Sequence, residues 1–143
     1  MRFEDYKHFT PIQIRFSDVD RLNHVNNACY LSYFELGRIN YFNEVFKEQI
    51  NWDEKGFILA RTEIDYLAPV FLTDEVYCLS KVIKIGTKSI TIKNCILKKD
   101  KEQLTECAKG KVVLVAMDYS FKKSIELPLE WIGIIKQFEN GLF

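Results

Sequence analysis

The feature that most constrains this chain is a helical pattern from Ala28 to Phe46 that is apolar on nearly every face. One set of residues in this segment repeats at helical spacing and forms one face of the helix. The remaining faces also carry large apolar side chains, namely Leu31, Tyr33, Leu36, Ile39 and Phe42. A helix that is hydrophobic all round is buried rather than laid on a surface. At about 19 residues it would be roughly 28 Å long, which is enough to cross a small domain. The pattern therefore predicts one central, buried helix.

The rest of the chain predicts a sheet that covers this helix. Alternating apolar residues indicate a first strand at Pro11 to Phe16, and the strand pattern resumes after Gly56. Later strands are expected at Phe57 to Phe71, Glu75 to Ile85, Lys88 to Lys98 and Leu104 to Asp118, followed by a short helix at Leu129 to Glu139. Consecutive strands linked as hairpins form a mostly antiparallel sheet. We therefore expect one α+β domain over residues 1–143, with about five strands curled around one long helix.

Charge and cysteine usage exclude several classes of protein. The 143 residues include 20 lysines and arginines and 20 aspartates and glutamates, so the formal net charge is zero. This is not the excess of basic residues typical of a general nucleic-acid binder. The sequence also contains no run of about 18 uncharged apolar residues, which a membrane-spanning helix would need. The four cysteines form no CxxC pair and fit buried thiols in a reducing compartment. We expect a cytoplasmic protein with neither nucleic-acid nor membrane-spanning character.

Histidines and glycines are too few or too scattered for several kinds of catalytic site. With only His8 and His24, zinc sites built on two or three histidines are nearly excluded. The six glycines assemble no GxGxxG, Walker or GxSxG motif, which argues against nucleotide-binding folds and serine α/β-hydrolases. We therefore predict no metal and no cofactor.

The segment directly before the central helix concentrates the reactive side chains. Two carboxylates, one histidine and three asparagines fall within ten residues: Asp18, Asp20, Asn23, His24, Asn26 and Asn27. Asn26 or Asn27 is the expected N-cap. Free N–H groups at a helix start can polarise a carbonyl, and a nearby carboxylate can serve as nucleophile or general base. From these residues alone, a solvated loop with a helix cap remains the alternative. A calcium loop fails, because Asn23 and Cys29 stand where glycine and glutamate are needed.

The spacing of this segment is similar to the signature of hotdog-fold acyl-CoA thioesterases of the 4-hydroxybenzoyl-CoA thioesterase family. The similarity lies in Asp18-Val19-Asp20, then His24-Val25-Asn26-Asn27 after three residues, Tyr30-Leu31 after two more, and Phe34-Glu35 with Arg38. It continues in residues 64–70 and 74–76 and covers roughly residues 10–120. The order of strand, long helix and four strands agrees with that fold.

The resemblance implies roles for the loop residues. Asp20 matches the catalytic carboxylate, which either attacks the thioester carbonyl or activates a water molecule. Asn27 matches the helix-start position whose backbone N–H points at the thioester oxygen. Asp18 and His24 are expected in support, Asp18 by shaping the turn and His24 by orienting Asp20 or by a hydrogen bond to the loop. Asn23 replaces a glycine that is common in the family, and asparagine tolerates a left-handed backbone better than most residues.

The resemblance also implies where the substrate binds. Lys84, Lys88 and Ser89 flank a Gly86-Thr87 turn and match the region that contacts the nucleotide of CoA, although a solvated hairpin tip remains an alternative. The strand Phe57 to Phe71 is poorly protected against edge pairing. The family's homodimer or homotetramer pairs this strand with its two-fold mate, so that Leu59, Ala60 and Arg61 line the neighbour's pocket.

The expected activity is hydrolysis of an acyl-CoA to a carboxylic acid and CoA. Two alternatives remain at this level. An acyl-carrier-protein thioesterase would be favoured by a basic docking face, which a neutral net charge makes less expected. A non-catalytic acyl-CoA-binding hotdog module would be expected to lack Asp20.

Overall fold

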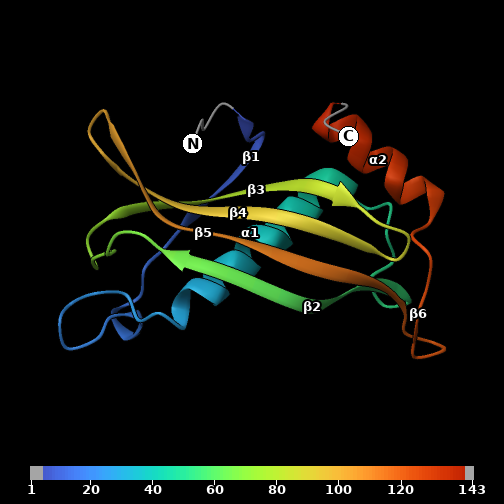
Figure 1. Ribbon diagram of the computed structural model, residues 1–143, viewed down its shortest axis with the longest axis horizontal. Helices are drawn as coiled ribbons and strands as arrows, with labels where there is room; N and C mark the ends of the chain where they lie inside the picture. Colours follow the sequence, from blue (N-terminus) through green and yellow to red (C-terminus); the bar gives the residue numbers. More distant parts are fainter. Residues whose placement is uncertain (1–4, 141–143) are drawn as a thin grey trace.

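The computed structural model describes residues 5–140 (Figure 1). Its strands are β1 (His8–Ile12), β2 (Lys55–Tyr66), β3 (Glu75–Ile85), β4 (Ser89–Asp100), β5 (Gln103–Asp118) and β6 (Lys123–Ser124). Its helices are α1 (Cys29–Phe46), α2 (Leu129–Glu139) and the 3-10 turn η2 (Phe16–Asp18). The predicted bounds of β3 and α2 are confirmed, and those of α1, β4 and β5 are correct to within two residues.

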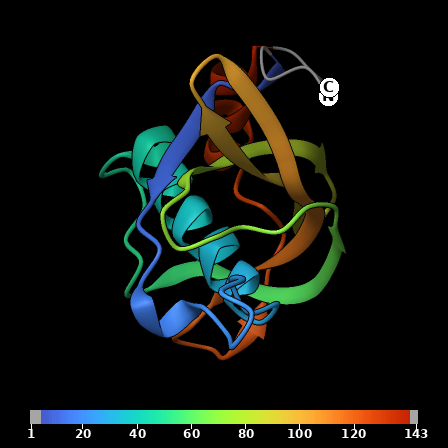
Figure 2. The ribbon, with the colours of Figure 1, turned by 90° about the vertical axis from the view of Figure 1, so that its left-hand side faces the viewer.

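The strands form one antiparallel sheet that curls around α1 (Figures 1 and 2). Their order is β1-β3-β4-β5-β2, and the short β6 pairs with β5. Val82, Ile92 and Val112 lie side by side on β3, β4 and β5, and each is at most 1% exposed. Side chains of alternate strand residues therefore pack on the helix, whose Phe34 is fully buried. The predicted α+β hotdog arrangement is confirmed.

The path of β2 differs from the prediction of consecutive hairpins. β2 pairs with β5, from Lys55 opposite Asp118 to Tyr66 opposite Ala108, and does not pair with β3. Both sides of β3 are already occupied, by β1 and by β4. β2 is therefore an edge strand within the described chain. It ends at Tyr66 rather than at Phe71, because the next two N–H groups both turn to the carbonyl of Cys107.

The first strand lies earlier than predicted. β1 spans His8–Ile12 and alternates between buried and exposed residues, whereas residues 14–16 are outside it. The chain bends there because the N–H of Arg15 donates to the carboxylate of Asp18, 2.9 Å away, which starts η2. The Phe16 side chain, expected on the inner face, is 83% exposed.

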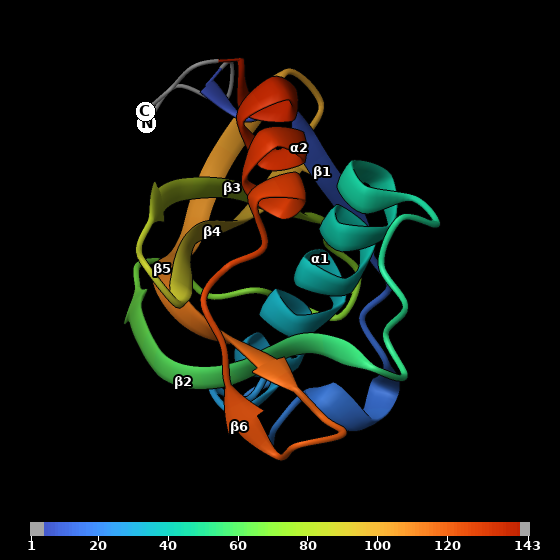
Figure 3. The ribbon, with the colours of Figure 1, turned by 90° about the vertical axis from the view of Figure 1, so that its right-hand side faces the viewer.

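The prediction that α1 is buried on every face is wrong for the isolated chain. One side of the helix is buried, but Leu31, Leu36 and Ile39 remain 45–47% exposed. The strands curve around α1 from β1 to β2 and, within residues 5–140, leave one side of the helix uncovered (Figure 3). A sheet of this width does not close around the helix, so three large apolar side chains stay in contact with solvent.

α2 closes the end of the sheet near the C-terminal half of α1. Glu139 on α2 is fully buried; its Oε2 accepts the hydroxyl of Tyr41 at 3.1 Å and the N–H of Val82 at 2.8 Å. This carboxyl group thus joins α2 to both α1 and β3. No helix within residues 5–140 has the length and hydropathy that a membrane crossing requires.

Candidate active site

The loop between η2 and α1 is a tight, hydrogen-bonded turn at one end of the molecule (Figure 2). The N–H of Asp20 donates to the carbonyl of His24 at 2.8 Å, and the N–H of Asn23 donates to the carbonyl of Asp20 at 3.0 Å. Asn23 has a φ of 66°, in the left-handed region. This confirms the expectation that asparagine supports the turn in which the family commonly has glycine.

Asp20 presents an exposed carboxylate that is held from one side. Its Oδ1 accepts the N–H of Leu22 at 2.9 Å and that of His24 at 3.3 Å. None of the hydrogen bonds found among residues 5–140 uses its other oxygen, Oδ2. The backbone of the turn therefore orients the group and leaves one oxygen available to a substrate or a water molecule.

The start of α1 leaves one N–H group available near this loop. The N-cap position is Ala28, which has no side-chain cap, so the predicted N-cap at Asn26 or Asn27 is wrong. Asn26 supports the turn two residues earlier: its side-chain Oδ1 accepts the N–H of Ala28 at 3.0 Å and its carbonyl accepts that of Cys29 at 2.9 Å. Asn27 lies directly before the N-cap position. Its carbonyl accepts the hydroxyl of Tyr66 at 3.0 Å, which ties the end of β2 to the helix start. Its N–H donates to no acceptor found within the described residues.

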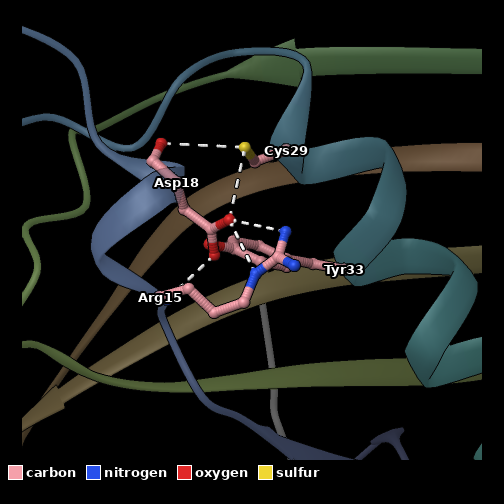
Figure 4. Close-up of polar contacts among 4 residues, drawn as sticks. All are labelled: Arg15, Asp18, Cys29 and Tyr33. Atoms are coloured by element: carbon pink, nitrogen blue, oxygen red, sulfur yellow. Dashed lines mark hydrogen bonds and ion pairs between the residues drawn. The ribbon is translucent and has the colours of Figure 1, made fainter.

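Asp18 is a buried anchor beneath the loop (Figure 4). Its carboxylate accepts the backbone N–H of Arg15 at 2.9 Å, the guanidinium of the same residue at 2.9 and 3.1 Å, and the hydroxyl of Tyr33 at 2.8 Å. The thiol of Cys29 lies 3.8 Å from the same carboxylate. Sequence reasoning expected Asp18 to shape the turn but missed Arg15 and Tyr33 as its partners. Arg15 lies at the i,i+3 spacing of a turn, which could have indicated it, whereas no spacing rule links Asp18 to Tyr33 on the face of the helix.

The hydrogen bonds decide the charge state of this anchor. Burial by itself raises the pKa of Asp18, but the bonds from Arg15 and Tyr33 outweigh burial and hold the pKa below its usual value. Conversely, burial together with the neighbouring Asp18 carboxylate raises the pKa of the Tyr33 phenol far above its usual value. At neutral pH the anchor is therefore an ionised carboxylate bound by a protonated phenol and a guanidinium.

His24 touches the loop differently from the expectation. Its ring packs edge-on against Phe71 at 5.0 Å, and its backbone bridges to the same residue. Among residues 5–140 no hydrogen bond joins its imidazole to Asp20; the contact runs through the His24 backbone N–H. The backbone of His24 thus holds the Asp20 carboxylate, whereas a supporting role of the imidazole ring remains a prediction.

Leu59, Ala60 and Arg61 lie in the middle of β2, where the register with β5 shifts. Leu59 faces α1 and lines a cavity of about 330 Å³ between the helix and the strand. Arg61 pairs with Glu63 at 2.7 Å on the opposite face of the sheet. Of this trio, the structure therefore places only Leu59 in the wall of this cavity.

Lys84, Lys88 and Ser89 lie around the β3–β4 turn, at the opposite end of the molecule from the loop that holds Asp20 (Figure 1). The turn is closed by a hydrogen bond of 2.7 Å from the N–H of Gly86 to the carbonyl of Ser89. One chain therefore does not bring these residues next to its own Asp20.

The donor set of the loop does not suggest a metal centre. Within the part of the chain that the structure describes, no group of three or more histidine, cysteine, aspartate or glutamate side chains is arranged to hold a metal ion. Asp18, the nearest second carboxylate in sequence, is already occupied by Arg15 and Tyr33.

Replacing Asp18 with asparagine is expected to lower the free energy of unfolding by about 1–3 kcal/mol near neutral pH, because the buried phenol of Tyr33 and the backbone N–H and exposed guanidinium of Arg15 lose the anion that they bind. The stabilisation from a depressed carboxyl pKa is present above the unfolded value of about 3.9 and is lost as pH falls through the folded pKa. The difference between the two proteins should be constant from about pH 5 upward and shrink below about pH 4.

Urea unfolding as a function of pH measures this difference. Asp20→Asn is the matched control, since its carboxylate is exposed, and it should change stability by only about 0.5 kcal/mol. An Asp18→Asn deficit that persists undiminished in acid would show that ionisation of this carboxyl does not stabilise the loop.

Solved structures, thioesterases among them, share this architecture. A thioesterase from Thermus thermophilus, in complex with coenzyme A and Zn, superposes with a TM-score of 0.84 at 32% identity, covering 96% of this chain and 98% of that one. The PA5185 protein of Pseudomonas aeruginosa strain PAO1 gives a TM-score of 0.80 at 26% identity, over 94% and 93% of the two chains. A 4-hydroxybenzoyl-CoA thioesterase complexed with 4-hydroxybenzoyl-CoA shares the fold, with a TM-score of 0.79 at 13% identity over 89% and 96%.

Sequence comparison points the same way. The uncharacterized protein YsmA of Bacillus subtilis (strain 168) is 30% identical over 96 residues, which are 64% of this chain and 65% of that protein. The match thus spans less than two thirds of that relative's length. A family model described as the thioesterase-like superfamily matches residues 14–134, which hold both the Asp20 loop and all the long strands. The chain therefore belongs to the thioesterase-like superfamily and has its hotdog fold.

Proposed function

We propose that this protein hydrolyses acyl-CoA thioesters to a carboxylic acid and CoA. The observation that carries the proposal is a pair of groups that have no hydrogen-bonding partner within the described residues: one oxygen of the Asp20 carboxylate in the loop before α1, and the N–H of Asn27 just before the helix. A helix start favours negative charge, so the Asn27 N–H is suited to the oxygen of a thioester carbonyl as it becomes an oxyanion.

Asp20 supplies the other half of the reaction. As a general base it takes a proton from water, whose oxygen bonds to the carbonyl carbon while the C–S bond breaks and the thiolate of CoA leaves. As a nucleophile it bonds to that carbon itself, releases the thiolate, and forms an anhydride that water then cleaves. Both routes use the same carboxylate oxygen, and both end with one carboxylic acid and one thiol.

The free edge of β2 supports a shared site between two copies of the chain. An exposed strand edge is a template for pairing, and antiparallel pairing centred near Ala60 and Arg61 would continue the sheet across a two-fold axis. Tyr66 of one copy would then lie beside the Lys55 end of the other strand. Because Tyr66 bonds the carbonyl of Asn27, the helix start of one copy would face the cavity beside Leu59 of the other.

The same two-fold axis relates the predicted nucleotide contacts to the loop. It would bring Lys84, Lys88 and Ser89 of one copy to the end of the joined sheet that carries the Asp20 loop of the other. Lysine contacts phosphate as a point charge, which suits an exposed hairpin tip. A dimer, alone or doubled into a tetramer, is therefore part of the proposal.

One observation favours a second candidate, an acyl-carrier-protein thioesterase. Lys81, Lys93 and Lys111 lie directly opposite one another across β3, β4 and β5, and their chain neighbours Val82, Ile92 and Val112 face the core. These three lysines, the lysine row, therefore share the convex face. No carboxylate within residues 5–140 pairs with any of them. Like charges directly opposite are destabilising by themselves, and an acidic partner would offset this.

Replacing Asp20 with asparagine is expected to lower kcat/KM for acyl-CoA esters by at least about a thousandfold, because the amide is nearly isosteric but is neither a nucleophile nor a base. Release of free thiol measures the rate, and thermal unfolding checks that the variant is folded. A variant that keeps more than about a tenth of the wild-type kcat/KM would remove Asp20 from the mechanism.

The carrier is tested by presenting one acyl group on CoA, on a truncated pantetheine thioester and on an acidic carrier protein. We expect CoA to be the best substrate, with Lys88→Ala raising KM for the CoA ester but not for the truncated ester. The paired variant Lys93→Gln and Lys111→Gln should leave the CoA ester unaffected. Preference for the carrier protein, with a KM raised only by that paired variant, would establish the second candidate instead.

Mixing two inactive variants tests the shared site. Asp20→Asn removes the carboxylate and Leu59→Trp fills the cavity, so a mixed dimer holds one intact site only if each site uses both chains. Random subunit exchange should restore about a quarter of the wild-type activity, since about half of the dimers are mixed and each has one working site of two. No recovery after verified exchange, or a fully active monomer in sedimentation, contradicts the shared site.

A further inference from the structure

Arg38 on α1 is a buried cation without a hydrogen-bonding partner in the described chain. Its side chain is 12% exposed, and the nearest carboxylate oxygen, on Glu35, lies 4.0 Å away on a side chain that is 61% exposed. Burial lowers the pKa of the guanidinium, and the Glu35 carboxylate only partly opposes this. Arg15, in contrast, makes two guanidinium bonds to Asp18. Buried charges in folded proteins are normally closely paired, so the guanidinium of Arg38, with only this long contact to a largely exposed carboxylate, is incompletely paired.

The guanidinium lies in the wall of the cavity between α1 and β2. The cavity of about 330 Å³ has aromatic and aliphatic side chains in its wall, among them Phe42, Trp52, Phe57 and Leu59, together with the polar Asn43 and the Glu35 carboxylate. Arg38 also lines a smaller neighbouring cavity of about 120 Å³. Ligand pockets of this kind are mostly apolar and carry a few polar groups that fix the ligand's orientation.

Three aromatic side chains pack against one another in the wall of this cavity. Phe42 and Phe57 are stacked at 5.2 Å with an interplanar angle of 13°, and Trp52 packs on both. Trp52 and Phe57 flank the start of β2, the end that the proposed two-fold pairing places beside the Asp20 loop of the second copy. An acyl group entering from that loop would pass this wall before its far end meets Arg38.

We infer that Arg38 makes this cavity selective for acyl groups that carry an anionic oxygen at their far end, most simply a terminal carboxylate. The inference rests on the proposed function, because the cavity receives an acyl group only when a second copy supplies Asp20. A guanidinium binds a carboxylate through two parallel hydrogen bonds, and the apolar walls around it strengthen the pairing. An acyl chain with a methyl end would leave this charge with only its long contact to Glu35.

The test compares esters matched in chain length: glutaryl-CoA with pentanoyl-CoA, and adipoyl-CoA with hexanoyl-CoA. The wild type should favour the carboxyl-ended member of each pair by about tenfold or more in kcat/KM. Arg38→Met, which keeps the length of the side chain without its charge, should remove that preference and leave the methyl-ended esters within about threefold. Arg38→Lys should fall between. Lys136→Met, which removes an exposed cation from α2, should change neither.

Inhibition of the wild type by free acids gives a second measurement that needs no folded variant. Glutarate should inhibit pentanoyl-CoA hydrolysis more strongly than pentanoate does. Equal or better hydrolysis of the methyl-ended esters by the wild type, or an equal loss on both classes in Arg38→Met, overturns the inference. The inference also fails if the Arg38→Met dimer dissociates while the wild type shows no preference for carboxyl-ended esters. That result would assign Arg38 to an ion pair between the two copies. A wild type that hydrolyses none of the esters refutes the proposed function instead.

Discussion

The geometry of the candidate site depends on one buried carboxylate. Asp18 receives hydrogen bonds from the backbone and guanidinium of Arg15, before the turn, and from Tyr33, on the second turn of α1. It therefore fastens the strand exit, η2 and the helix to one another. Because its charge is buried, releasing any of these partners costs more than a surface ion pair would. The exposed Asp20, two residues later, is held at the surface by this anchor rather than by contacts of its own side chain with the core.

A single chain leaves one side of α1 and one edge of the sheet uncovered, and both features have the same cause. A sheet of this width wraps only part of α1, so Leu36 and Ile39 stay half exposed while β2 keeps an unpaired edge. Apolar surface and free backbone groups in adjoining places are what a second copy would cover together. The opposite placement of the Asp20 loop and the β3–β4 turn is consistent with a site that two chains share.

Net charge describes this protein poorly, because its charges are segregated by the fold. The sum is zero, yet the lysine row lies on the convex face and Arg38 lies near the concave core. The lysines of the row repel one another, and Arg38 is a mostly buried cation that Glu35 pairs only weakly. Both are unfavourable alone, and both become favourable with an anion. The location of each charge, rather than their total, therefore carries the functional information.

The sequence by itself determined the elements and the reactive loop. Helical and alternating periodicity depend on neighbouring residues, so α1, α2 and β3 were predictable, as was the loop of Asp20 and Asn27 with its asparagine in a left-handed turn. Pairing of β2 with β5, the bond of Tyr33 to Asp18 and the exposed side of α1 were decided only by the tertiary structure. Each depends on which segments, distant in sequence, come to lie beside one strand edge, one carboxylate or one helix face. Local periodicity depends only on neighbouring residues and therefore cannot predict such contacts.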